Sequence, residues 1–160
     1  MTEDREIPVK IKIVSKQSEE QLFPHEIGEG EQADLNVTEM YAEGVLFFSE
    51  KRIAITYDET ELTGMEGTRT RLFFARQNPG MVSLSRDGTV KTALHFEAGR
   101  QHITVYQTPY LTCELCVYTY ELENNISETG GMLRLRYDLK ISGACLERTE
   151  LLFEAVPSVS

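Results

Sequence analysis

The sequence predicts an all-β fold, a single closed antiparallel β-barrel of about eight to ten strands. Short runs in which apolar and polar residues alternate recur along nearly the whole chain, and Gly, Pro, Asn or Asp residues separate them. No window combines helical periodicity with capping residues. Closure into a barrel would also pair the sheet edges that such a strand-rich chain otherwise exposes.

The first half of the chain holds several of these runs. Residues 8–14 alternate Val and Ile with Lys, which is typical of a half-buried strand. The segment from Ser15 to Asp34 is polar and acidic, and we expect a long acidic loop or the extended end of a hairpin there. Further strands are expected at residues 35–48, with Gly44 as a turn or bulge, at 52–62 and at 68–75.

A three-stranded meander is predicted over residues 80–106, and its turns suggest a register. If Gly88 takes the left-handed position of a tight turn, Leu84 lies opposite Val90 and Val82 opposite Thr92. The following turn places Leu94 opposite Ile103 and Thr92 opposite Val105. A one-residue slip would turn a strand's apolar set to water, so the pattern favours one shared apolar face. The residues expected on that face are Val82, Leu84, Val90, Leu94, Phe96, Ile103 and Val105.

The second half of the chain predicts three longer strands. Pro109 interrupts pairing because proline has no N–H to donate. Strands are then expected at residues 111–122, at 133–141, where the alternation is cleanest, and at 144–156.

Length and charge limit the class of protein. The chain has 160 residues, and one domain over residues 1–160 is the expectation. Its formal net charge is −10, from 26 acidic and 16 basic residues. Proteins that bind nucleic acid or anionic membranes place Lys and Arg on phosphates, so this balance argues against both partners.

The start of the chain and its cysteines predict the compartment. Residues 1–6 are acidic and hold no apolar run, so we expect no signal peptide. No stretch approaches the roughly 18 apolar residues of a membrane helix. The chain has 3 cysteines, an odd number that predicts reduced thiols. We therefore expect a cytoplasmic protein.

Several short segments of the chain resemble a known family. They are Tyr57-Asp58-Glu59, Thr63-Gly64-Met65-Glu66-Gly67-Thr68, Val82-Ser83-Leu84-Ser85-Arg86-Asp87-Gly88, Phe96-Glu97-Ala98-Gly99, Tyr106-Gln107-Thr108-Pro109-Tyr110 and Leu133-Arg134-Leu135-Arg136-Tyr137-Asp138-Leu139 with Gly143. Through them, the stretch from Asp34 to Val156 is similar to the YwiB-like bacterial family. The resemblance implies a calycin-like, lipocalin-type β-barrel from a family whose function is not established, and it assigns no catalytic residue. The chain departs from the family at Leu111, where Gly is expected, and in a longer segment from Ser15 to Asp34.

Two residue pairs resemble metal or redox sites without completing one. Cys113 and Cys116 form a C-x-x-C within a strand, where an offset of three sends the side chains to opposite faces. His95 and His102 lie opposite each other on the polar face in the register above, but no third ligand is evident. We interpret the cysteines as structural and the histidines as a solvated pair, and we predict no metal and no cofactor.

Two groups of charged and aromatic residues are candidates for ligand binding. Glu59 and Glu61 lead into a turn that returns through Arg69 and Arg71, and these charges could grip a polar ligand at a barrel mouth or form exposed ion pairs. In the last hairpin, one register points Glu147 inward near Tyr137, and the other points Arg148 there. Either way the interior receives a polar group, unless a bulge lets the chain change face.

These observations leave two functions open. A lipocalin-type barrel can hold one small ligand, for which the candidate residues are Tyr137, Glu147, Arg148, Tyr57, Glu59 and Arg71. The alternative is a non-catalytic interaction or accessory domain whose filled core supports an acidic surface. No phosphate-binding glycine loop, nucleophile elbow or metalloprotease motif is present, so we predict no catalytic residues, and an enzyme whose residues gather from distant strands at the barrel mouth is a third, less favoured, function. The sequence does not define an oligomeric state.

Overall fold

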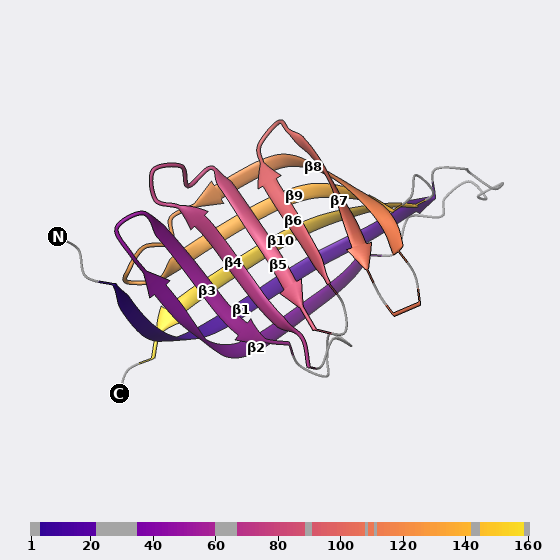
Figure 1. The fold of residues 1–160 in the computed structure, drawn as a ribbon. Helices are drawn as coiled ribbons and strands as arrows, with labels where there is room; N and C mark the ends of the chain where they lie inside the picture. The colour runs from indigo at the N-terminus through magenta and orange to yellow at the C-terminus, as the bar shows by residue number, and fades with distance from the viewer. Residues whose placement is uncertain are drawn as a thin grey trace.

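The computed structural model describes residues 4–21, 35–59, 67–88, 91–107, 109–110, 112–141 and 145–158. Within them, ten strands form one antiparallel sheet in the order β6-β5-β4-β3-β2-β1-β10-β9-β8-β7. The sheet curves round on itself, and both chain termini lie at one end (Figure 1). The strands are β1 (Arg5–Gln21), β2 (Leu35–Phe48), β3 (Arg52–Asp58), β4 (Arg69–Ala75), β5 (Met81–Asp87), β6 (Thr92–Glu97), β7 (Gln101–Gln107), β8 (Thr112–Asn124), β9 (Gly131–Ile141) and β10 (Cys145–Pro157). No helix in these ranges is long and apolar enough to cross a membrane.

The barrel closes almost completely where the two end strands, β6 and β7, meet. Near the start of β6, Lys91 and Gln107 exchange two backbone hydrogen bonds of 3.0 Å. Near its end, Gly99 N–H donates to the Thr119 carbonyl at 2.8 Å, and Thr119 N–H donates to Arg100 at 3.2 Å. Between these contacts the described parts of β6 and β7 form no continuous ladder, so a narrow seam remains in the wall. The predicted fold class, an all-β antiparallel barrel, is confirmed.

The long strands β1 and β2 pair with each other in the middle of the strand order. β1 pairs with β2 on one side and with β10 on the other, and it continues as far as Gln21. The segment that starts at Ser15 therefore begins as strand, and residues 22–34 lie outside the described residues. The expectation of a turn or bulge at Gly44 is wrong, because β2 passes through it in regular register, opposite Val9 and Tyr57.

Alternate residues of the strands point into the barrel and form its core. Because neighbouring strands are antiparallel and in register, apolar residues of one parity gather on the inner face. The most completely buried large apolar side chains are Phe96, Phe153, Ile11, Leu46, Ile55, Leu72, Leu133, Leu135, Val9, Val82 and Val117.

The register predicted for the first turn of the meander, between β5 and β6, is wrong. Leu84 pairs with Leu94 rather than with Val90, so the β5–β6 connection is longer than a tight turn. The displacement is even-numbered, so Val82, Leu84, Leu94 and Phe96 still face inward, whereas Val90 lies outside the described residues.

The last strand of the meander presents the opposite face from the one expected. Ile103 and Val105 are 60% and 49% exposed and point outward. The reason is that β7 forms its ladder with β8 and not with β6, so the alternation of β8 sets its orientation. His102 lies opposite the buried Val117, and Thr104 opposite the buried Leu115.

Candidate functional site

The inner face of the barrel changes from apolar to polar toward the end remote from the termini. Polar residues occupy inward positions there on many of the strands, and several are almost fully buried. Thr70 and Thr119 are 0% exposed, Thr149 is 1% exposed and Glu59 is 5% exposed. Burial of so many polar groups requires hydrogen-bond partners from the protein, from water or from a ligand.

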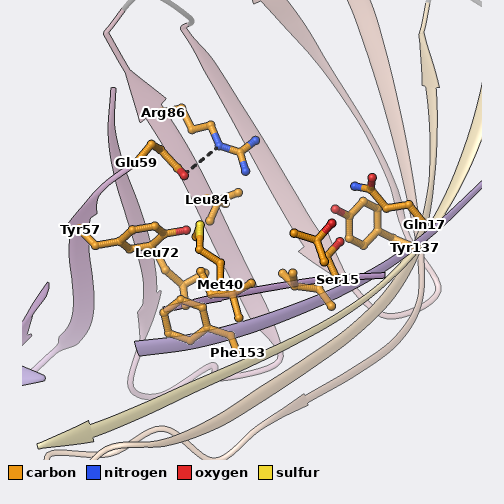
Figure 2. Close-up of a pocket in the computed structure, with 13 residues that line it drawn as sticks. Ser15, Gln17, Met40, Tyr57, Glu59, Leu72, Leu84, Arg86, Tyr137 and Phe153 are labelled. Carbon is orange, nitrogen blue, oxygen red and sulfur yellow. Dashed lines mark ion pairs between the residues drawn. The ribbon is translucent and has the colours of Figure 1, made fainter. Parts of the chain in front are cut away.

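A cavity of about 290 Å³ lies at this polar end of the interior. Its apolar wall consists of Ile13, Met40, Leu72, Leu84, Leu151 and Phe153. Its polar wall consists of Ser15, Gln17, Thr38, Tyr57, Glu59, Arg86 and Tyr137. Figure 2 shows Glu59 and Tyr57 on one side and Tyr137 with Gln17 on the other. A concave site with an apolar wall and a few convergent polar groups is typical of small-molecule pockets.

Glu59 is the most deeply buried acid of this wall. It directly follows β3, and its backbone N–H donates to the Thr68 carbonyl at 2.9 Å, which holds the residue against β4. Its Oε1 accepts a hydrogen bond from the Thr70 hydroxyl and lies 3.6 Å from Arg86 Nε. Its Oε2 is buried and has no hydrogen-bond partner in the described part of the chain. One carboxylate oxygen is therefore left for another donor.

Arg86 occupies an inward position on β5 between two inward threonines. It lies opposite Thr70 on β4 and Thr92 on β6. Its side chain is 26% exposed, against 1% for the side chain of Glu59, and the two lie close together on one side of the cavity, joined by an ion pair (Figure 2). Arg86 also borders a shallow hollow at the seam, with Lys91, Thr104 and other residues of β5, β6 and β7. The guanidinium thus stands between the cavity and the gap in the barrel wall.

The two tyrosines of the cavity keep their protons at neutral pH. Burial raises the pKa of Tyr57 well above its ordinary value, and the nearby charge of Glu59 adds to the effect. Burial likewise raises the pKa of Tyr137. Tyr57 packs near Phe153, with ring centroids 6.2 Å apart. The cavity therefore offers neutral aromatic rings beside a buried carboxylate.

The structure brings four of the six predicted site residues to the interior. Tyr57, Glu59 and Tyr137 line the cavity. Glu147 faces inward from β10, where its Oε1 accepts a hydrogen bond from Thr149, the partner of Tyr137 in the β9–β10 ladder. Of the two registers considered for the last hairpin, this is the one that turns Glu147 inward.

The other two predicted site residues point outward. Arg148 forms an ion pair with Asp138 on the outer face. The Arg71 guanidinium lies over the Phe73 ring, 5.1 Å from its centroid. Glu59 is paired with Arg86 rather than with Arg71, because Glu59 and Arg86 both have inward parity and Arg71 does not.

The sequence interpretation missed Arg86 and the polar residues of β1. Arg86 lies just before Gly88, where the sequence predicts a tight turn. Its parity with Val82 and Leu84 is the signal that places it on the inner face. Ser15 and Gln17 belong to the segment expected to be a loop or the extended end of a hairpin, and they continue the inward parity of Ile11 and Ile13.

The predicted histidine and cysteine pairs do not form a metal site in the described residues. The rings of His95 and His102 are near each other, 5.9 Å between centroids, and His95 Nδ1 is 2.8 Å from Ser83 Oγ. His102 faces inward, however, so the two do not share the polar outer face. Cys113 packs against the core and is a free thiol, as is Cys116. No three His, Cys, Asp or Glu side chains gather there to hold an ion.

Fold and cavity together define the class of protein. It is a nearly closed antiparallel barrel with a cavity at the polar end of its interior. The chain belongs to the family described as "Domain of unknown function (DUF1934)", whose model matches residues 24–152. Its fold is similar to that of the ywiB protein from Bacillus subtilis in a crystal structure, with a TM-score of 0.71 and 20% sequence identity. That likeness covers 96% of this chain and 94% of the other. It confirms the resemblance to YwiB-like proteins. No curated protein matches the sequence.

Proposed function

We propose that this protein binds a small molecule inside its barrel, as a binding protein of the cytoplasm. The observation that carries the proposal is the buried carboxylate of Glu59 at the edge of a cavity, with Oε2 lacking a donor. Leaving a buried charged acceptor unsatisfied costs about 1–3 kcal/mol or more, so such a group is retained where a ligand or water completes it. The odd number of cysteines favours a reducing compartment.

The size of the cavity limits the ligand. A volume of about 290 Å³ is near the lower end for small-molecule sites, which corresponds to a compact ligand rather than a lipid. The apolar wall, with Leu72, Leu84 and Phe153, would contact the body of such a ligand. The polar wall would fix its orientation through hydrogen bonds.

Native mass spectrometry of the full chain tests this proposal. We expect an added mass of a small molecule on protein purified from cells under mild conditions, and its loss after denaturation and refolding. The variant Leu84→Phe, which adds a ring on the cavity wall, should no longer carry it. The matched control is Met81→Phe, which adds a ring on the same strand at an outward position that is 37% exposed. Equal retention by both variants, or no retention by the wild type together with no binding of added compounds, would overturn the proposal.

A further inference from the structure

Building on the proposed function, we infer that the ligand of the cavity is a compact organic cation, an amine with an apolar body. Three features carry this inference: a deeply buried carboxylate at the cavity, an oxygen of that carboxylate without a hydrogen-bond donor among the described residues, and aromatic rings around the same space. Each is a property of described residues.

The charged groups of the described cavity lining are Glu59 and Arg86. Glu147 faces inward from β10 but is not part of that lining. The Tyr57 and Tyr137 phenols are uncharged. Because the Glu59–Arg86 pair is neutral overall, the sign of the ligand depends on which partner is the more deeply buried, and the side chain of Glu59 is 1% exposed against 26% for that of Arg86.

The hydrogen-bonding pattern also requires a donor. The hydrogen bond from Thr70 and the ion pair with Arg86 are both made through Oε1 of Glu59, and the Tyr57 phenol also lies near this carboxylate, yet Oε2 has no hydrogen bond in the described part of the chain. An ammonium group carries only donors, and a hydrogen bond from it to a buried carboxylate is charge-assisted and strong. A carboxylate or phosphate ligand would instead place a second anion beside Glu59.

Arg86 is a weak competitor for such a ligand. Its Nε is 3.6 Å from Glu59 Oε1, beyond hydrogen-bond distance, and that Nε has no hydrogen-bond partner in the described ranges. Its side chain has access to the hollow at the seam and is 26% exposed, whereas Glu59 is fixed by the backbone bond to Thr68. A cation at Oε2 can therefore be accommodated while Arg86 stays at Oε1 or turns toward the seam.

Aromatic rings complete a site of the kind that binds ammonium groups. Tyr57, Tyr137 and Phe153 all line the cavity. Ring faces attract cations through their quadrupole, and the attraction is strongest where water is excluded. The overall charge of −10 also attracts cations toward the protein and repels anions.

Isothermal titration calorimetry with three matched probes tests the inference. The probes are phenethylamine, phenylacetate and phenethyl alcohol, which share a body and differ in charge. We expect the amine to bind tightest to the full chain at neutral pH. Glu59→Gln should weaken the amine about tenfold or more, since it removes the charge from the accepting oxygen. Arg86→Gln should strengthen amine binding, because it removes the cation that competes for the Glu59 carboxylate.

The two variants separate the sign of the ligand from the existence of the site. Tighter binding of phenylacetate, with loss in Arg86→Gln, would overturn the cation and leave the proposed function standing. Equal affinities of the three probes, unaffected by Glu59→Gln, would likewise overturn the cation and leave the proposed function standing. Absence of binding by all three would count against the cation and, if native protein carries no small molecule, against the proposed function also. Arg71→Gln, on the outer face, is the control for a change of net charge, and thermal unfolding checks that each variant is folded.

Discussion

Arg148 and Asp138 form a two-pronged ion pair across β9 and β10 on the outer face of the barrel. Nε lies 2.9 Å from Oδ1, and the second guanidinium nitrogen lies 3.3 Å from Oδ2. The Tyr120 hydroxyl donates to the same carboxylate, and its ring lies beneath the Arg148 guanidinium. Asp138 is only 7% exposed, so this cluster is more than a surface ion pair.

Asp138→Asn should therefore destabilise the protein by about 1 kcal/mol at neutral pH, because paired arginine–carboxylate bonds exceed the value of exposed ion pairs. Burial opposes ionisation of Asp138, but hydrogen bonds from Arg148 and Tyr120 outweigh it and lower the pKa. A lowered pKa in the folded state contributes stability above the unfolded value of about 3.9, and this is lost as the pH falls through the folded pKa. Urea unfolding of wild type and variant should differ at about pH 7 and converge in strong acid.

The control for this prediction is Asp58→Asn. Asp58 lies 3.3 Å from Arg69, but the two side chains are 77% and 68% exposed, so solvent screens the pair. Its removal should leave the unfolding midpoint unchanged at both pH values. An equal effect of the two variants would show that burial does not increase the contribution of the Asp138 cluster to the free energy of unfolding.

Tyr57→Phe should make the protein less sensitive to alkali. Burial and then the charge of Glu59 raise the pKa of Tyr57 in the folded state, so its phenol ionises first in the unfolded chain. The Tyr57 phenol contributes its full stabilisation below its pKa in the unfolded chain, which is about 10. This stabilisation is lost as the pH rises from that value toward the higher pKa of the folded state. Between about pH 9 and about pH 11, the free energy of unfolding measured with denaturant should fall less in the variant than in the wild type. A fall equal to that of the wild type would contradict the assigned burial of Tyr57.

Strand positions and strand faces were largely predictable, because they depend on local alternation. The run from Leu133 to Ile141 matches β9, and the inward set of β5 survives an error of register since an even displacement preserves parity. The partner of β7 was not predictable in the same way. Ile103 and Val105 alternate like core residues, but the barrel closes at this strand, and only three-dimensional closure decides which neighbour it pairs with.

The candidate site was predictable only in part for a related reason. The faces of the strands that hold Tyr57 and Tyr137 follow from the sequence, and an inward Glu147 belongs to one of the two registers it allows, whereas the meeting point of these residues depends on curvature. Arg86 pairs with Glu59 across β4, which separates their strands in the sheet. A charged residue next to a turn signal is usually exposed, so nothing local marks Arg86 as inward except its parity with Leu84.

Leu135→Ala should destabilise the protein by about 2–5 kcal/mol, the usual effect of emptying a filled core position. Leu135 is 0% exposed, and it lies between Leu151 of β10 and Leu122 of β8. Met132→Ala on the same strand is the control, because Met132 is 39% exposed and its loss should change stability by no more than about 0.5 kcal/mol. Chemical denaturation measures both. Equal effects would mean that the assigned face of β9 is wrong.

Gly44→Ala should destabilise the barrel because β2 passes unusually close to its neighbours at that point. A Cβ added to Gly44 would lie 2.3 Å from the Thr56 carbonyl oxygen and 2.8 Å from Ile11 Cδ1. The first of these is backbone of β3 and cannot rotate away, so relief requires movement of the ladder, at a cost of about 1–3 kcal/mol. Gly80→Ala is the matched control, since its nearest neighbour would be a side-chain oxygen of Asn78 at 3.8 Å. Thermal unfolding should show a lower midpoint for Gly44→Ala alone. A midpoint equal to that of wild type would mean that β2 and β3 are further apart, and that the wall beside Tyr57 is looser than described.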